Sequence, residues 1–371
     1  MASISQSNVR ANPDLRPEIT RAWEVGTDVR FLNNRIGLDL TYYNSLTFNQ
    51  ILRVEVSPTT GFDFILKNAG KIRSSGWEVV LNGRVVEREK FKWNTTLNWS
   101  RDRSVVEEYD RENPDAFLSR GVTNFLFVED RLGERRGALY GKTFQTAPNG
   151  EILYTKSGDT QRGNKEFLGN YNPDWMGSMF NQFEYGPFSL SFLLDVRYGG
   201  VFYSRTNFNL NIRGLSEATL LGGTDADGNP TPRENILPDG MVLDDGEFRK
   251  LTREDLIESG LSSGGLTGQQ FWENVMDAEI PAAVIYDASY LKLRELSVSY
   301  ELPQSFLSKL AVRSARVGIV MRNIAVWTDV PNVDAETFSR AEDSAAGNIP
   351  GFDNGGIPSL RNIAFNLNLK F

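Results

Sequence analysis

The chain has 371 residues, a net charge of −8 at neutral pH, and neither cysteine nor histidine. Without these two residue types, Cys-His catalysis, Ser-His-Asp catalysis and the usual zinc sites are excluded. The acidic balance and the lack of a basic stripe argue against a nucleic-acid surface. The sequence therefore predicts a protein that is not an enzyme and has no metal, no cofactor and no nucleic-acid partner.

Segments that alternate apolar and polar residues recur along the whole chain. Because neighbouring side chains of a strand point to opposite faces, this alternation predicts strands with one apolar and one polar face. Most segments exceed the ~5–6 residues of an average soluble strand and suit the ~9–11 residues with which a tilted strand crosses a membrane. We predict about nine strands, at 23–31, 36–42, 77–81, 91–99, 176–185, 188–203, 290–302, 315–327 and 360–371.

The predicted connections alternate between short and long. Tight periplasmic turns and broad extracellular loops give this order in a membrane barrel, whereas a β-sandwich has no reason to keep it. Because single-chain bacterial barrels have an even number of strands, an odd number indicates the C-terminal part of a larger barrel, or one half of a split one. The fold prediction is thus an antiparallel transmembrane β-barrel segment with outer loops at about 53–73, 107–174, 204–289 and 328–359.

The last predicted strand places its apolar residues on one face and ends on an aromatic residue. Outer-membrane barrels end in this way, because the final strand closes the barrel and its terminal aromatic lies at the membrane edge. The alternative is the closing strand of a soluble sandwich. The predicted C-terminal assembly signal, with the barrel-assembly machinery as its partner, consists of Phe365, Leu367, Leu369 and Phe371.

Four tryptophans lie near the ends of predicted strands, at Trp77, Trp93, Trp99 and Trp327. Amphipathic rings favour the bilayer interface, so these residues are predicted to be membrane-interface aromatics; the alternative is an ordinary sandwich core. In the strand at 290–302 the apolar parity changes. This change predicts either a β-bulge near Arg294 or a strand end that projects above the bilayer.

The longest loop contains a short helical signal. Thr267 and Gln270 have the spacing of a capping box, and the predicted helix carries Phe271 and Trp272. An exposed Trp272 would stack on a sugar ring or pack on a protein partner, and these two aromatics are the candidate substrate contacts of the loop. The alternative is a hydrophobic plug that anchors the loop.

Charged residues of the inward parity are further candidates. Asp195 and Arg197 are predicted to face a wet lumen, together with Arg316 and Arg322. Asp195 and Arg197 are candidate substrate contacts, and the alternative role of all four residues is structural pairing with one another or with a plug.

The segment Asp225 to Asn229 begins like a calcium loop, with oxygen ligands at alternate positions. Pro230 then occupies the place of the required glycine, and Ile236 that of the bidentate glutamate. A solvated turn is therefore predicted in place of a calcium site.

Six stretches carry a family likeness, in the order NPDLRPE (12–18) with WEVGTD (23–28), NAGKI (68–72) with GWE (76–78), LGNYNPDW (168–175), DVRYGG (195–200), ASYLKLRE (288–295) and RNIAVW (322–327). They resemble the C-terminal half of the SusC/RagA-type TonB-dependent outer-membrane transporters of Bacteroidetes. The resemblance implies a 22-stranded barrel with an N-terminal plug and a TonB box, and neither the plug nor the TonB box is found in this chain.

The resemblance also implies a function and partners. The chain is expected to be a component of a transporter in the cell outer membrane that imports large nutrients, oligosaccharides or peptides, by binding and gating. The implied partners are a SusD-like surface lipoprotein and, through the missing N-terminal part, the TonB complex. The alternative function is that of a secreted carbohydrate-binding β-sandwich protein.

Overall fold

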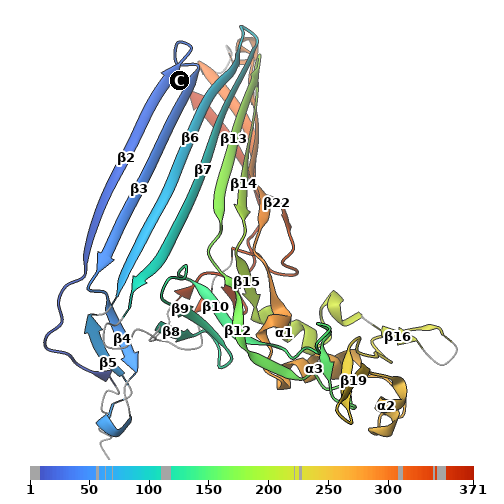
Figure 1. The fold of residues 1–371 in the computed structure, drawn as a ribbon. Helices are drawn as coiled ribbons and strands as arrows, with labels where there is room; N and C mark the ends of the chain where they lie inside the picture. The colour runs from blue at the N-terminus through green and yellow to red at the C-terminus, as the bar shows by residue number, and fades with distance from the viewer. Residues whose placement is uncertain are drawn as a thin grey trace, which may run out of the picture.

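The largest feature of the computed structural model is an antiparallel sheet of nine strands, in the order β2-β3-β6-β7-β13-β14-β21-β22-β26 (Figure 1). The structure describes residues 9–55, 58–62, 64–68, 70–109, 118–220, 222–224, 228–307, 312–336, 339–340 and 348–371. The sheet strands are β2 (Ile19–Phe31), β3 (Ile36–Phe48), β6 (Lys71–Glu87), β7 (Phe91–Glu108), β13 (Trp175–Tyr185), β14 (Phe188–Tyr198), β21 (Tyr290–Glu301), β22 (Ser314–Thr328) and β26 (Asn362–Lys370). The predicted nine-stranded sheet is confirmed.

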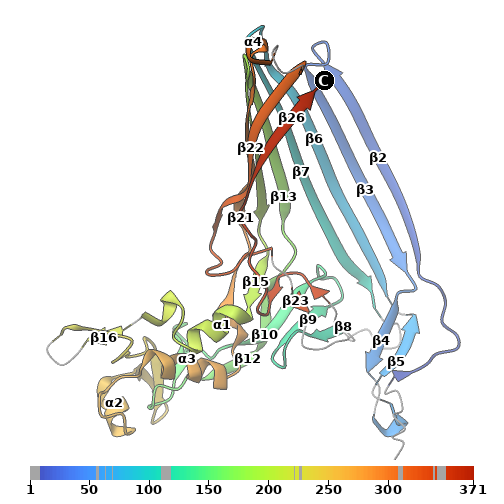
Figure 2. The ribbon, with the colours of Figure 1, turned by 180° about the vertical axis from the view of Figure 1, so that it is seen from behind.

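The sheet curls into an open trough, with β2, β3, β6 and β7 on one side and β21, β22 and β26 returning behind them (Figures 1 and 2). The short connections gather at one end, which we call the turn end, and the long ones at the other, the loop end. Within the described residues, β2 and β26 each pair with only one strand of this sheet. Unpaired strand edges are costly in lipid, so the trough is one part of a barrel wall.

One face of the sheet is apolar over its whole width, and we call it the apolar face. Directly paired residues share a face, and the register places Leu38, Leu81, Leu97 and Met179 side by side in the middle of it. Leu97 remains 37% exposed and Phe365 80% exposed, so these side chains do not pack into a core. The apolar face is therefore the face that meets hydrocarbon, as the alternation predicts.

The opposite face, called the polar face, carries the alternate residues. Asp39, Val80, Asn98 and Ser178 form the neighbouring row, and Asn98 Nδ2 donates to Ser178 Oγ at 3.0 Å. Rows of hydrogen-bonded polar side chains of this kind suit a wet barrel interior. The two faces together give the pattern of a transmembrane wall.

Aromatic residues border the apolar face at both ends. Toward the loop end, the ring of Tyr42 lies 5.3 Å from that of Trp23 and 4.7 Å from that of Trp77. Toward the turn end, the rings of Trp93 and Phe183 stack with their centroids 5.5 Å apart. The registers place all four tryptophans named from the sequence, Trp77, Trp93, Trp99 and Trp327, on the apolar face.

One polar side chain on the apolar face is covered by these rings. Asn181 is only 3% exposed, and the indole Nε1 of Trp93 donates to its Oδ1 at 2.9 Å. We expect Trp93→Phe to destabilise the folded barrel by about 1–3 kcal/mol, because it leaves the buried amide oxygen without its donor. The free energy of unfolding in urea, measured on the full-length protein in detergent, tests this expectation.

The matched control removes both polar groups. In the Trp93→Phe, Asn181→Leu double variant no amide is left unpaired, so it should be more stable than Trp93→Phe alone. If the two variants unfold at the same urea concentration, the hydrogen bond has no role in stability.

The register of β21 shifts between Leu293 and Glu295, and Arg294 is the extra residue relative to β14. This is the β-bulge predicted near Arg294. It puts Leu291 and Leu293 on the same face as Leu296, since a bulge restores the parity that the sequence interrupts. It also takes Arg294 out of the regular pairing.

The strand predicted at 188–203 is wrong in its last five residues. β14 ends at Tyr198, and the chain turns at Gly199 and Gly200, whose φ angles are +75° and +85°. Glycine accepts these angles without strain, so the strand can break there although the hydrophobic pattern continues. β15 (Val201–Ser204) then pairs with β20 and β25 in a separate sheet.

The long connections fold into a body at the loop end (Figure 1). Its main core joins Leu126 and Leu139 with Phe208 and Val275 from the next long connection and with Phe352 from the last. Its strands and helices are β8 (Leu118–Gly121), β9 (Leu126–Asp130), β10 (Ala138–Phe144), β11 (Leu153–Tyr154), β12 (Arg162–Asn170), α1 (Arg205–Ile212), β16 (Gly222–Thr224), β17 (Pro230–Pro232), β18 (Met241–Asp244), β19 (Glu247–Lys250), α2 (Arg253–Glu258), α3 (Gly268–Asp277), β20 (Ile285–Asp287), β23 (Ser339–Arg340), β24 (Asn348–Ile349) and β25 (Phe352–Asp353).

The remaining elements are short. They are β1 (Val9–Arg10), β4 (Ile51–Glu55), β5 (Phe64–Asn68), α4 (Gln304–Leu307) and the 3-10 turns Pro58–Thr60, Glu217–Leu220 and Pro281–Val284. Among the helices described, none is long and apolar enough to span a bilayer.

Candidate functional site

The polar face carries a cluster of charges where β14 and β21 approach the loop end. Lys292 of β21 pairs in register with Asp195 of β14, so both side chains project from the same face. Arg294 occupies the bulge next to them. The register between β14 and β21, together with the β-bulge in β21, thus brings two cations and a carboxylate together.

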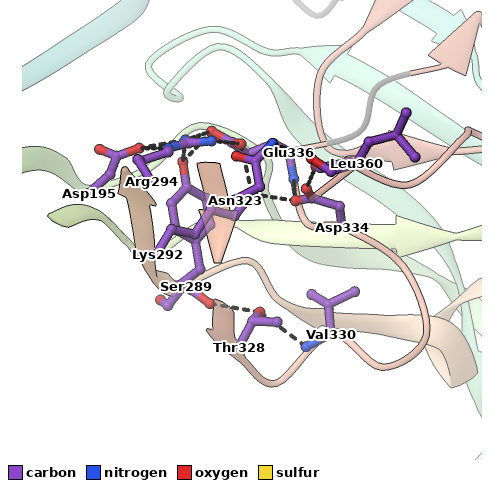
Figure 3. Close-up of polar contacts among 12 residues, drawn as sticks. Asp195, Ser289, Lys292, Arg294, Asn323, Thr328, Val330, Asp334, Glu336 and Leu360 are labelled. Carbon is purple, nitrogen blue, oxygen red and sulfur yellow. Dashed lines mark hydrogen bonds and ion pairs between the residues drawn. The ribbon is translucent and has the colours of Figure 1, made fainter. Parts of the chain in front are cut away.

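The connection after β22 supplies two more carboxylates (Figure 3). Lys292 Nζ lies 2.5 Å from Asp334 Oδ1 and 2.7 Å from Glu336 Oε2. Arg294 joins β14 to this connection: its Nη2 is 2.5 Å from Asp195 Oδ2, and its Nη1 donates to Glu336 Oε2 at 2.6 Å. We call these five residues the inner-wall cluster.

Two members of the cluster are largely shielded from water. The side chain of Lys292 is 6% exposed and that of Asp334 is 11% exposed. Burial raises the pKa of Glu336, but hydrogen bonds from Arg294, Lys292 and Tyr290 outweigh it and bring the pKa down to about 2. For Asp334, burial is likewise outweighed by hydrogen bonds from Lys292 and Ser359, so its pKa lies below the ordinary value. Both carboxylates are therefore charged at neutral pH.

Hydrogen bonds from uncharged donors support the same docking of the last long connection onto the wall. The hydroxyl of Tyr290 donates to Glu336 Oε1 at 2.7 Å, and Asn323 Nδ2 donates to the carbonyl of Leu360 at 3.0 Å. Ala335 packs with Tyr290 in a small core at this point. The arrangement holds a loop against the inside of the wall, with two cations paired to three carboxylates.

Two hollows lie beside these elements. A groove of about 590 Å³ runs along β22 and includes Lys292, Val326, Asp334 and Arg361 in its lining. A second groove, of about 630 Å³, lies between the end of α1 and the start of α3, and its lining includes Arg213, Arg233, Thr267 and Gln269. Both are open, and both are lined by a mixture of polar and apolar groups.

The predicted helix with Phe271 and Trp272 is α3. Its capping box is confirmed: Thr267 Oγ1 accepts from the Gln270 amide at 3.1 Å, and Gln270 Oε1 accepts from the Thr267 amide at 2.9 Å. Trp272 is half-buried and packs against the main core of the loop body, with the ring of Phe271 edge-on to it at 5.6 Å. This packing is the anchoring alternative considered for Trp272.

The four charged residues of inward parity lie on the polar face, but they do not pair with one another in the part of the chain that is described. Asp195 joins the inner-wall cluster, and Arg197 donates to the carbonyl of Tyr171. Arg322 pairs with Glu295 at 2.9 Å, and Arg316 pairs with Glu301 at 3.5 Å. Both ion pairs are exposed.

Sequence reasoning did not find four of the five cluster residues. The predicted bulge was the available signal, because Arg294 is its extra residue and Lys292 lies two residues before it, whereas nothing local marks Asp334 or Glu336. As for metals, Asp225 to Asp227 lie outside the described residues, so the turn predicted there stays a prediction. In the ranges that are described, no group of three or more Asp and Glu side chains is placed to hold a metal ion.

A curled antiparallel sheet with one apolar, lipid-facing side and one polar, inward side defines a segment of a transmembrane β-barrel. Residues 2–232 match the family model "TonB dependent receptor-like, beta-barrel". The chain belongs to this family, and it is an outer-membrane protein as predicted.

Curated relatives and solved structures agree with this assignment. The chain is 25% identical to TonB-dependent receptor P3 and 22% identical to TonB-dependent receptor P26, both of Formosa agariphila, over 97% of this chain and 35% of each relative. The RagAB peptide transporter structure is similar in fold, with a TM-score of 0.65 at 16% identity over 97% of this chain and 36% of that one. The RagAB peptide importer in the open-open state gives a TM-score of 0.63 at 18% identity. The chain thus spans about a third of the length of these relatives.

Proposed function

We propose that this chain forms the C-terminal wall and outer loops of a TonB-dependent transporter that imports large nutrients, peptides or oligosaccharides, across the outer membrane. The observation that carries the proposal is the nine-stranded sheet with its apolar and polar faces, in a chain of the TonB-dependent receptor family. The name of the RagAB structures, a peptide transporter, supports import of a large solute. A single curled sheet is at odds with the alternative of a secreted β-sandwich.

The parts of the transporter follow from this proposal. The loop end is extracellular and the turn end periplasmic, and the barrel is completed to 22 strands around a plug. A SusD-like surface lipoprotein covers the loop body, and the TonB complex acts on the N-terminal part. Nutrient contacts come from the polar face, through Asp195 and Arg197, and from the loop body, through Phe271 and Trp272.

Uptake by intact cells tests the proposal. Cells that lack the gene should lose TonB-dependent accumulation of labelled peptides or of labelled oligosaccharides, and a plasmid copy should restore it. Unchanged uptake of both nutrient classes, or uptake that persists without TonB, contradicts the proposal. Co-purification of a surface lipoprotein with the full-length protein tests the partner separately.

The C-terminal strand makes a further testable claim. In β26, Phe365, Leu367 and Leu369 follow one another on the apolar face, and Phe371 continues that parity. We expect deletion of Phe371 to lower the amount of full-length protein in the outer membrane several-fold, because the assembly machinery reads an apolar terminal strand that ends on an aromatic. Heat-modifiable migration of outer-membrane fractions measures folded protein, with Lys370→Ala as the control. Normal levels without Phe371 refute an assembly role.

A further inference from the structure

The charged residues of the apolar face are confined to its loop end. Following the registers across the nine strands as described, the charged side chains of that parity are Arg21, Lys71, Arg73, Arg101, Arg103 and Glu107, together with Glu108, which pairs in register with Lys71. No such charge occurs on the same face toward the turn end of these strands. The lipid-facing side of the wall is therefore cationic at one rim alone.

Two of these arginines have no hydrogen-bond or ion-pair partner among the described residues. Arg73 Nε pairs with Glu107, and Arg73 Nη1 donates to Asn44 Oδ1 at 2.8 Å. Arg101 and Arg103 are exposed, and within the described residues neither makes a hydrogen bond or an ion pair. Because Glu107 neutralises Arg73 and Glu108 neutralises Lys71 at 2.6 Å, the guanidinium groups of Arg101 and Arg103 leave a net charge of about +2 at this place.

The surroundings fix the depth of these two residues in the membrane. Arg101 pairs in register with Trp77, and Arg103 with Ser75, one step nearer the loops. On the other side of β7, Ser100 pairs with Met176, so Trp175 is the residue next to Arg101 on β13. Arg101 thus lies within the aromatic border and Arg103 just beyond it. Guanidinium groups at this position reach the headgroup layer, because burying them in hydrocarbon is costly.

We propose that Arg101 and Arg103 form a binding site on the outside of the barrel for the phosphate groups of lipopolysaccharide in the outer leaflet. Guanidinium groups bind phosphate through paired, charge-assisted hydrogen bonds, and the flanking indole rings of Trp77 and Trp175 favour the same interfacial depth. The site rests on the proposed function in one respect, that the loop end faces the cell exterior. It is distinct from the nutrient path, which runs along the opposite face.

Lipid retention by the full-length protein tests this site. The protein is purified in neutral detergent, loaded with bisphosphorylated lipid A or with dephosphorylated lipid A, and the bound lipid is counted by native mass spectrometry. We expect about tenfold more bisphosphorylated lipid A bound, and an approximately tenfold loss in the Arg101→Gln, Arg103→Gln variant. The control variant Arg316→Gln, Arg322→Gln removes two exposed arginines from the polar face and should stay within twofold of the unchanged protein.

The outcomes distinguish lipid phosphate from soluble phosphate as the ligand, and loss of the site from loss of folding. Equal retention in the glutamine variant, or equal retention of dephosphorylated lipid, overturns the site. Displacement of lipid A by equimolar inorganic phosphate would mean a soluble-phosphate site and also overturns it. If the glutamine variant does not fold, the Arg101→Lys, Arg103→Lys variant replaces it, because lysine keeps the charge but lacks the paired N–H donors of a guanidinium group. Loss of lipid A retention in the lysine variant supports the site. Full retention in the lysine variant opposes a site in which paired guanidinium donors bind the phosphate. Nutrient uptake, measured in parallel, reports on the proposed function independently.

Discussion

Leu97→Arg is expected to destabilise the folded barrel by about 2–4 kcal/mol, the cost of a cation on the lipid-facing side near the bilayer midplane. Leu97 is paired with Leu81 on one side and Met179 on the other, in the middle of the apolar band between the two aromatic borders. An arginine there has the longest path to either headgroup layer, so it cannot bring its charge into water without distorting the wall.

The neighbouring residue provides the control. Asn98 lies on the polar face, where it bonds Ser178, and Asn98→Arg places the same cation in the aqueous interior. This change should cost much less than the change at Leu97. Urea unfolding of the full-length protein in lipid vesicles compares the two free energies. Equal losses at both positions would mean that the two faces are assigned the wrong way round.

The two faces could be predicted because a membrane wall imposes a strict rule on the sequence. Most lipid-facing positions within the hydrocarbon band must be apolar, and positions alternate, so a period of two survives in each strand separately. The parity change around Arg294 could be read as a bulge for the same reason. These are local patterns, and no knowledge of distant contacts is needed to see them.

The errors and omissions concern places where that rule does not apply. The strand predicted through Tyr203 stops at Gly199 because the chain leaves the wall there, while Phe202 and Tyr203 remain apolar for the core of the loop body. Hydrophobic alternation does not distinguish a lipid-facing strand from a short strand under a loop. Trp272 posed the same problem, since a partly covered ring and an exposed one look alike in sequence.

The inner-wall cluster could not have been found from pattern at all. Lys292 and Asp334 are 42 residues apart, and their contact depends on how the last long connection folds back onto the wall. Neither acid of that connection lies in a periodic segment. Such contacts follow from tertiary packing, which a single sequence does not display.

Removing Lys292 should release the docked connection. We expect Lys292→Met to cost about 3 kcal/mol of docking free energy, because it leaves Asp334 charged, largely buried and without its cation. Hydrogen exchange of amides 329–336 in the full-length protein measures this, and a loss of that size lowers their protection roughly 100-fold. The control is Arg322→Met, which breaks the exposed pair with Glu295 and should change protection little. Equal protection in the two variants would show that the cluster does not hold the connection.

The same docking should depend on pH in a direction that the carboxylates set. The pKa of Glu336 falls from its ordinary value of 4.5 to about 2 when it is docked, so the docked state holds fewer protons than the released one. The contribution is therefore complete above about pH 5 and is lost as the pH falls from there toward 2. Protection of amides 329–336, corrected for the intrinsic exchange rate at each pH, should stay constant from pH 7 to 5 and then decrease, whereas Glu336→Gln should flatten much of that decrease. A decrease already present between pH 7 and 6 would mean that another group controls the docking.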